Sequence, residues 1–259
     1  MRDQFKFADE LDVADKTVLL RIDVNVPIAN GLVSNDTRIR HVMPGVRTLL
    51  DNGAKVVILT HFGRPKGKIV PSLSVRPVAK AISEILDQPV PVESDVIGEG
   101  GRAAVDALRP GDILLMENLR FYSGEEKNDI EFARSLAELG DLYIGDAFSC
   151  AHRAHASVDA LPRMMPSAVG RSFIAELEAL QAALSQPIRP LGVVVGGAKV
   201  SSKLSVIVNM LNVVDNLIIG GGMAYTFIKN NGGSIGDSIF EKDCLNAVSY
   251  THLTLPTKA

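Results

Sequence analysis

Short apolar runs alternate along the chain with segments in which apolar residues recur at helical spacing. Runs rich in Val, Ile and Leu predict buried strands at 18–23, 55–60, 112–118 and 141–148. Periodic segments predict helices at 36–50, 75–86, 96–108 and 129–139, with a further short apolar run at 90–92. This alternation predicts an α/β fold, a mostly parallel sheet with helices on both faces.

A longer periodic segment at 172–184 predicts a helix that ends before Pro187 and Pro190 and separates two domains. Two strand–glycine–helix units follow it, LGVVVGGAKVSSKL and NLIIGGGMAYTFIK. Two strands and two helices are too few to bury a stable core, so we expect this second domain to be incomplete or to lean on the first. The predicted organisation is a first domain, a connecting helix with its linker, a partial second domain and a tail, at 1–171, 172–190, 191–247 and 248–259.

The tail, VSYTHLTLPTKA, is rich in threonine and shows no helical period. The segment before it, FEKDCLNA, starts like an amphipathic helix that we expect to stop where the tail begins. We therefore expect a truncation followed by an unrelated sequence.

Composition narrows the class of protein. The chain has 259 residues, 46% of them hydrophobic and 22% charged, which is ordinary for a globular protein. Its net charge of −3 argues against a nucleic-acid-binding protein that works by bulk positive charge. There is no apolar signal core, no run of membrane-spanning length and no disulfide spacing between Cys150 and Cys244, so we expect a cytoplasmic protein without a membrane partner.

Polar residues follow each predicted strand of the first domain. Parallel strands bring these positions to one edge of the sheet, where ligands bind in such folds. The candidates are Asp23, Asn25, His61, Arg64, Arg120, His152 and Arg153, with Arg38 at the start of its helix. Arginine forks favour phosphate and carboxylate groups, so the sequence predicts a site for a small polyanion.

Other interpretations of these residues remain open. Each arginine could form a surface salt bridge of little energetic value, and each histidine could support its loop through backbone hydrogen bonds. Cys150, His152 and His155 lack a standard zinc spacing and a fourth ligand, so we predict no metal site. For Arg21 we expect a structural role as an ion-pair partner.

The second domain carries glycines directly after its strands. Gly197, Ala198, Lys199 and Lys203 suit a phosphate group at a helix N-terminus, with both lysines expected on one helix face. Gly221 and Gly222 would let a flat adenine or its sugar pass close to the backbone, although a tight packing turn would also explain them. A nicotinamide-dependent enzyme is disfavoured, because no dinucleotide fingerprint with its downstream acidic residue is present.

Together these motifs resemble the phosphoglycerate kinase family. The resemblance rests on RIDVNVP, HFGRPKGK, ENLRFYSGEEKND, DAFSCAHRAHAS, VVVGGAKVSSKL and GGGMAYTFIK, which stand in the family's order. Phe62 replaces the family's usual leucine, and we expect the likeness to run from about Val13 to about Cys244.

The resemblance implies two facing Rossmann-like domains, the second of them incomplete here, in a monomeric glycolytic enzyme that binds no nucleic acid. The first domain would bind 3-phosphoglycerate or 1,3-bisphosphoglycerate, and the second MgADP or MgATP. Substrate would contact Asp23, Asn25, Arg38, His61, Arg64, Arg120, His152 and Arg153. Nucleotide would contact Gly197, Ala198, Lys199, Lys203, Gly221 and Gly222, while Arg38, Lys199 and Lys203 would stabilise the transferring phosphoryl group.

In the family, the aspartate that holds Mg²⁺ lies beyond the region of likeness. We therefore expect this chain to be weakly active or inactive as a kinase. The alternative is a non-catalytic phosphoglycerate-binding fragment.

Overall fold

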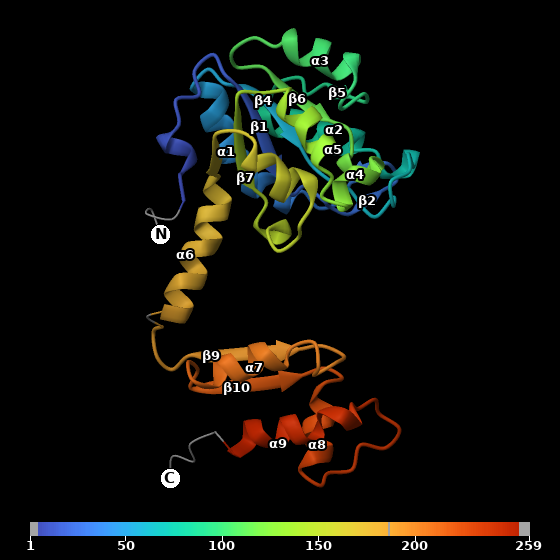
Figure 1. Cartoon of the computed structure of the whole chain (residues 1–259), viewed down its shortest axis with the longest axis vertical. Helices are drawn as coiled ribbons and strands as arrows, with labels where there is room; N and C mark the ends of the chain where they lie inside the picture. The colour runs from blue at the N-terminus through green and yellow to red at the C-terminus, as the bar shows by residue number, and fades with distance from the viewer. Residues whose placement is uncertain (1–4, 186, 254–259) are drawn as a thin grey trace. The chain divides into compact units, whose positions relative to one another are not determined.

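The computed structural model describes residues 5–185 and 187–253, with side chains up to Ser249. The chain divides into two compact units, Met1–Leu177 and Glu178–Ala259. Figure 1 shows the helices and strands of each unit.

Six parallel strands form the central sheet of the first unit, in the order β5-β6-β4-β1-β7-β8. Their bounds are β1 (Thr17–Ile22), β4 (Lys55–Leu59), β5 (Val92–Glu93), β6 (Ile113–Met116), β7 (Leu142–Asp146) and β8 (Ser167–Val169). In the register, Leu20 of β1 pairs with Ile58 of β4 on one side and with Ile144 of β7 on the other. The predicted parallel α/β sheet is confirmed.

Every residue of β1 is buried, which explains why its apolar residues run on from 18 to 20 rather than alternating, with Arg21 as a buried charged exception. Leu20 packs into a core with Ile39 and Ile82, while the preceding Leu19 packs into a second core with Phe132 on the opposite face. Successive side chains of a strand point to opposite faces, so one short run serves two cores. The result is the three-layer arrangement predicted from the sequence.

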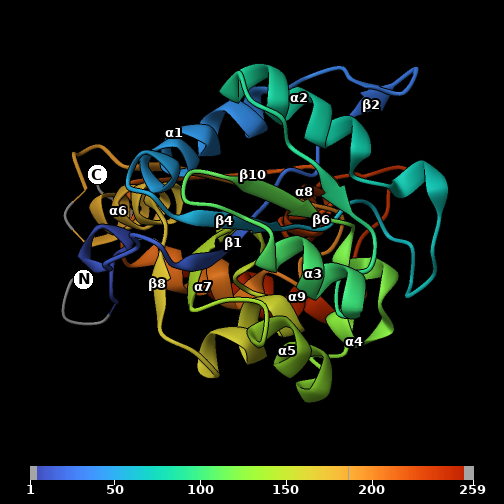
Figure 2. The same ribbon diagram turned by 90° about the horizontal axis from the view of Figure 1, so that it is seen from above.

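Helices cover both faces. Figure 2 shows α1 (Thr37–Asp51) and α2 (Arg76–Leu86) on one side of the strands and α5 (Ile130–Ala137) on the other. The same unit contains α3 (Glu99–Asp106), α4 (Ser123–Glu126), an antiparallel pair β2 (Ile28–Ala29) and β3 (Leu32–Val33), and the short turns η1 (Ala8–Glu10), η2 (Pro71–Leu73), η3 (Leu119–Phe121), η4 (Phe148–Cys150), η5 (Ala156–Ala160) and η6 (Leu161–Arg163).

The order of the strands reverses at β1. The chain passes from β1 to β4 on one side, and only later to β7 on the other side. Loops that leave the carboxyl ends of β1 and β7 therefore run apart, and ligands of open α/β sheets bind in the crevice this creates. This edge carries the polar residues singled out in the sequence.

The second unit is small. It begins within α6 (Arg171–Ser185) and continues through β9 (Gly192–Gly196), α7 (Leu204–Leu211), β10 (Asn216–Gly220), α8 (Ala224–Asn230), η7 (Lys242–Cys244) and α9 (Leu245–Leu253). β9 and β10 pair in parallel, and the core beneath them centres on Val195, Val200, Ile207, Met223 and Val248. The described helices of the chain are too short or too polar to span a bilayer.

Two local predictions for this unit are wrong. Lys199 and Lys203 do not share a helix face, because α7 begins only at Leu204. Val200 is fully buried in the small core and its carbonyl accepts the N–H of Lys203, which draws residues 200–203 into turns ahead of the helix. The predicted loss of helical structure after 247 is also wrong, because α9 continues to Leu253.

The small core predicts low local stability for the second unit. Val194 and Ile218 remain 72% and 58% exposed on its two strands, whereas β1 is wholly buried. We expect backbone amides of β9 and β10 to exchange at least about tenfold faster than those of β1 and β4. Hydrogen-exchange mass spectrometry measures this directly, and equal protection of the two sheets would contradict it.

Candidate functional site

Loops after β1 and β7 and the first turns of α1 and α6 enclose a pocket of about 550 Å³. Its lining includes Asp23, Asn25, Arg38, Asp146 and Ser149. The pocket therefore lies where the strand order reverses, the position expected for a ligand.

Asp23 is the hub of this pocket. Its buried carboxylate accepts hydrogen bonds from the hydroxyl of Ser149, from the backbone N–H of Asn25 at 3.0 Å and from Arg38 at 3.2 Å. Burial favours the neutral carboxyl, but the hydrogen bonds from Ser149 and Asn25 outweigh it and hold the pKa of Asp23 below its usual range. Asp23 is thus a charged anchor for Arg38.

Arg38 projects from the start of α1 to the open side of the pocket. Its Nη1 also donates to the backbone carbonyl of Asn25 at 3.0 Å, and half of its side chain is exposed. Two acceptors on Nη1 fix the direction of the guanidinium. The planar group can then present its other N–H groups to an anion.

Asp146, at the end of β7, forms another wall. Its Oδ1 accepts the backbone N–H of Phe173 at 2.7 Å, which ties the strand to the first turn of α6. Burial raises the pKa of this carboxyl.

His61 and Arg64 follow β4 in a tight loop. Gly63 between them has a positive φ of 58°, and a Cβ there would come within 2.7 Å of Leu73. Its N–H donates to the side chain of Asn25 at 3.2 Å, so the loop is joined to the β1 loop. Arg64 is exposed, and His61 is 5% exposed.

Arg120 follows β6, is 4% exposed, and donates to the carbonyl of Gly63 at 2.7 Å. Its Nε lies 3.3 Å from Glu126 but makes no hydrogen bond. Among the described residues, it is the one buried side-chain nitrogen or oxygen without a hydrogen-bond partner. Asn118, two residues earlier, clamps the same loop through both the N–H and the carbonyl of Phe62. Asn118 is the last residue of the strand predicted at 112–118, but the sequence did not show this support.

The β7 loop supplies the remaining candidates. Arg153 is partly buried and donates to the exposed His152 at 3.3 Å. Its charge acts on both His61 and Arg120, so these groups lie near one another. Residues far apart in the sequence are therefore brought together at one edge, and Arg38, Arg64 and His152 are the exposed ones among the candidates.

His61 is uncharged at neutral pH. Burial, followed by the charges of Arg21 and Arg120, lowers the pKa of His61 to about 3. An anion at this site would meet a neutral imidazole surrounded by permanently charged guanidinium groups.

Arg21 differs from the expectation of a direct ion pair. It is 1% exposed, and its Nε and Nη2 contact Ser157 and the Nδ1 of His61 at 2.8 and 3.0 Å. The carboxylate of Glu125 lies one hydroxyl further away, beyond Ser157. Nothing in the sequence pattern points to Ser149, Ser157 or Glu125 as part of this site.

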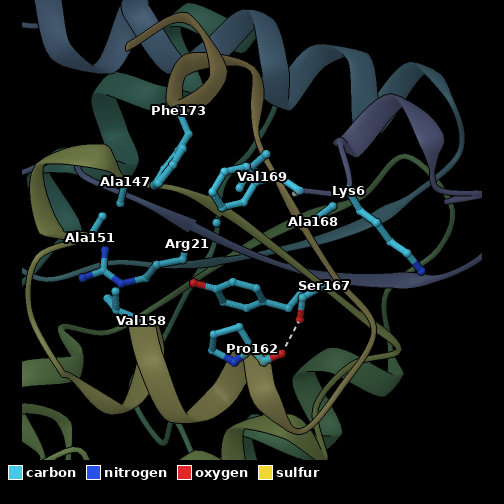
Figure 3. Close-up of a pocket in the computed structure, with 13 residues that line it drawn as sticks. Lys6, Arg21, Ala147, Ala151, Val158, Pro162, Ser167, Ala168, Val169 and Phe173 are labelled. Atoms are coloured by element: carbon cyan, nitrogen blue, oxygen red, sulfur yellow. Dashed lines mark hydrogen bonds between the residues drawn. The ribbon is translucent and has the colours of Figure 1, made fainter. Parts of the chain in front are cut away.

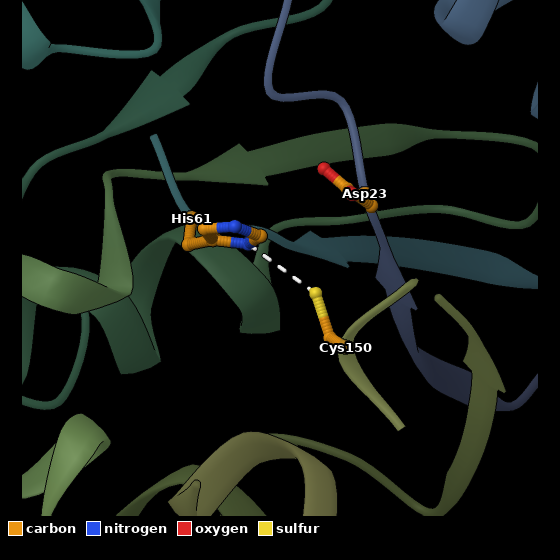
Figure 4. Close-up of side chains that lie close together, drawn as sticks. All are labelled: Asp23, His61 and Cys150. Carbon is orange, nitrogen blue, oxygen red and sulfur yellow. Dashed lines mark hydrogen bonds between the residues drawn. The ribbon is translucent and has the colours of Figure 1, made fainter. Parts of the chain in front are cut away.

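Asp23, His61 and Cys150 bring their potential ligand atoms within 4.8 Å of one another, the one such trio among the described residues (Figure 4). Cys150 approaches the Nδ1 of His61 at 3.9 Å rather than His152 and His155, the partners considered from the sequence. However, Arg38 already binds Asp23 and Arg21 already binds Nδ1. Two neighbouring guanidinium charges oppose a metal cation, so we do not interpret the trio as a metal centre.

A second cavity of about 380 Å³ lies beside β8 (Figure 3). Apolar groups such as Phe173 and Val169 form most of its wall. The hydroxyl of Ser167 is already bonded to Pro162 at 2.7 Å, and the guanidinium of Arg21 to Ser157 and His61. This cavity lacks the convergent free polar groups of the β1–β7 pocket.

In the second unit, the loops after β9 and β10 pack backbone against backbone. Gly221 has a φ of 69°, and a Cβ there would approach the carbonyl of Gly197 to 2.9 Å. Gly222 lies against Ala198 in the same way, and Met223 donates to the carbonyl of Gly197 at 2.8 Å. Close packing alone thus requires glycine at 221, whatever ligand the loops hold.

Lys199 is exposed and Lys203 half-buried in the segment before α7. The segment is held by Glu241, which accepts the N–H and the hydroxyl of Ser201 at 3.0 and 2.7 Å. These hydrogen bonds lower the pKa of Glu241. Both lysines therefore follow the carboxyl end of β9, but from a loop and not from a helix.

Residues 8–255 match the family model described as phosphoglycerate kinase. The chain is 51% identical over 239 residues to a phosphoglycerate kinase of Ruegeria sp. and 52% identical over 240 residues to one of Chelativorans sp.. Each alignment covers 92% of this chain and 60% of the relative, so the chain spans about 60% of the length of these relatives.

Solved structures agree. The phosphoglycerate kinase of Coxiella burnetii superposes with a TM-score of 0.83 at 40% identity, covering 96% of this chain and 63% of that one. The enzyme of Pyrococcus horikoshii gives a TM-score of 0.80 at 32% identity over 96% and 64%. The sequence predicted a likeness from about Val13 to about Cys244. The family match extends further than these limits at both ends.

Proposed function

Because the chain belongs to the phosphoglycerate kinase family, we propose that the first unit binds 3-phosphoglycerate or 1,3-bisphosphoglycerate and the second binds ADP or ATP. The reaction is reversible phosphoryl transfer between the acyl phosphate and the nucleotide. One observation carries the proposal: His61, Arg120 and Arg153, from the loops after β4, β6 and β7, lie near one another, and Asp23 of the β1–β7 pocket interacts with both His61 and Arg38.

The pocket suits a small dianion. Arg38 is pre-oriented by Asp23, and Arg120 and Arg153 add permanent charge around the neutral His61. Fixed positive groups stabilise phosphate and carboxylate oxygens without reorganising when the ligand arrives. We assign substrate contacts to Asp23, Asn25, Arg38, His61, Arg64, Arg120, His152 and Arg153.

Phosphoryl transfer requires alignment and positive groups around the transferring oxygens more than covalent chemistry from the protein. We assign this role to Arg38, Lys199 and Lys203. Gly197, Ala198, Gly221 and Gly222 would let the nucleotide lie against the backbone.

Mg²⁺ accompanies the nucleotide in this family and would neutralise its phosphates. Among the described residues, the carboxylate joined to the Lys199 loop is Glu241, and both its oxygens are occupied by Ser201. The described loop therefore fits the phosphates but not the metal, and we derive no step through Mg²⁺.

A binding measurement isolates the residues present. We expect isothermal titration of the chain with 3-phosphoglycerate to give saturable binding with a dissociation constant of about 1 mM or tighter. Glycerate without the phosphate should bind far more weakly, because the arginine cluster then loses its dianion. Absence of binding at high ligand concentration would contradict the proposed site.

A non-catalytic phosphoglycerate-binding fragment is the second candidate, and the coverage of about 60% of the relatives is what favours considering it. The two differ in turnover. A coupled assay with 1,3-bisphosphoglycerate and MgADP separates them, since a fragment would bind the substrate without forming ATP.

A further inference from the structure

A buried chain of hydrogen bonds leads from Glu125 to His61. The hydroxyl of Ser157 donates to Glu125 Oε1 at 2.6 Å, and Nε of Arg21 donates to that hydroxyl at 2.8 Å. Nη2 of Arg21 lies 3.0 Å from Nδ1 of His61. None of the four side chains is more than 5% exposed, so water does not compete for these bonds.

The chemistry of arginine fixes the direction of the last bond. A guanidinium has only donors, so Nδ1 of His61 must accept. A neutral imidazole that accepts at one nitrogen carries its proton on the other, and the proton of His61 therefore belongs on Nε2. The neighbouring thiol of Cys150, 3.9 Å from Nδ1, is compatible with the same assignment because it too can donate.

The other end of the chain holds Arg21 in place. Glu125 Oε2 also accepts the backbone N–H of Ser157 at 2.9 Å, which fixes the carboxylate and the hydroxyl together. The negative charge of Glu125 compensates the positive charge of Arg21, and the hydroxyl of Ser157 lies between the two groups. Arg21 is thereby kept at His61 rather than turned toward a ligand.

Nε2 of His61 remains open. Among the described residues it has no hydrogen-bond partner. Unlike Arg120 Nε, it is not fully buried. The groups that act electrostatically on the ring are Arg21, Arg120, Arg153 and Asp23. A small ligand that entered this cluster would meet Nε2.

We propose that Arg21, held by Ser157 and Glu125, is a positioning residue that fixes His61 in the Nε2–H tautomer, so that the neutral ring donates to an anionic oxygen of the substrate. This rests on the proposed function. The opposite tautomer would turn a lone pair toward the anion and repel it. Because the low pKa of His61 keeps the ring uncharged, the tautomer alone decides between attraction and repulsion.

The tautomer is measured in the free protein by NMR of a sample labelled with ¹⁵N in its five histidines, with His61→Gln to assign the signals. We expect Nδ1 of His61 to be unprotonated and Nε2 protonated from about pH 5 to about pH 8. Arg21→Met should mix the tautomers and raise the pKa of His61. A protonated Nδ1 in the unsubstituted chain, or an unchanged tautomer in Arg21→Met, would overturn the proposal.

Folding of Arg21→Met is checked by circular dichroism. Should it fail to fold, Ser157→Ala provides the second variant, since it removes the hydroxyl that accepts from Nε of Arg21. It should shift the same His61 signals in the same direction. Unchanged signals in Ser157→Ala would argue that Arg21 needs no support from Glu125.

Two substitutions of His61 test the use of Nε2. Glutamine places its amide nitrogen near the position of Nε2, whereas asparagine reaches only that of Nδ1. We expect His61→Gln to bind 3-phosphoglycerate within about fivefold of the unsubstituted chain, and His61→Asn to bind about ten- to a hundredfold more weakly. The reverse order would overturn the proposal.

Arg134→Met is the matched control, because Arg134 is exposed and paired with Glu131 on α5, and it should leave both readouts unchanged. The two levels of inference fail differently. If the unsubstituted chain does not bind 3-phosphoglycerate, the proposed function is wrong, but the tautomer measured without ligand still decides the role of Arg21.

Discussion

Replacing Arg38 with alanine is expected to weaken binding of 3-phosphoglycerate about a hundredfold. The substitution removes a pre-oriented guanidinium and its charge-assisted hydrogen bonds to the ligand. It also removes a hydrogen-bond donor and a positive charge from beside Asp23. The negative charge of that carboxylate then repels an incoming anion more strongly. Isothermal titration of the purified variant gives the change in affinity.

Arg40 provides the control on the same helix. Its side chain is 63% exposed and paired with Asp36, away from Asp23. Arg40→Ala should change the affinity less than about twofold. Arg38→Lys should lie between the two, because lysine keeps the charge but not the planar fork. Equal affinities for Arg38→Ala and Arg40→Ala would show that the β1–β7 pocket is not the binding site.

The sequence predicted the sheet because its signals are local. The run that becomes β1 is apolar at 18–20 and at Ile22, and Asp23 and Asn25 follow it at once, so both the burial and the exit of the strand were visible in a few residues. The same holds for His61 after β4. Parallel pairing then places these exits at one edge without further information.

Contacts between distant positions could not be predicted in this way. Ser157 meets Arg21 from 136 positions away, and Ser149 meets Asp23 from 126 positions away. Serine is common in loops, so its identity carried no signal there. The prediction of a helix through Lys199 and Lys203 failed for another reason. The burial of Val200 decides where α7 starts, and the spacing of the two lysines carries no information about that burial.

The second large effect concerns acid stability. In the unfolded chain His61 titrates near 6.5, but in the folded protein burial and then Arg21 lower its pKa to about 3. Between these values the unfolded state binds a proton that the folded state does not, so stability falls as the pH falls. From about pH 7 to about pH 4 we expect His61 to account for a loss of about 3 kcal/mol in the free energy of unfolding of the first unit.

Neighbouring groups act in the same window or just below it. The lowered pKa of His155 adds to the loss, the raised pKa of Asp146 opposes it, and the lowered pKa of Asp23 adds a further loss below about pH 4. The difference between the unsubstituted chain and His61→Gln isolates His61, because glutamine does not titrate and the other groups remain. Urea unfolding followed by hydrogen exchange in peptides of β1 and β4 measures the first unit separately from the second. A pH dependence in His61→Gln as steep as that of the unsubstituted chain would mean that the pKa of His61 is the same in the folded and unfolded states, and the ring would then be a cation below about pH 6.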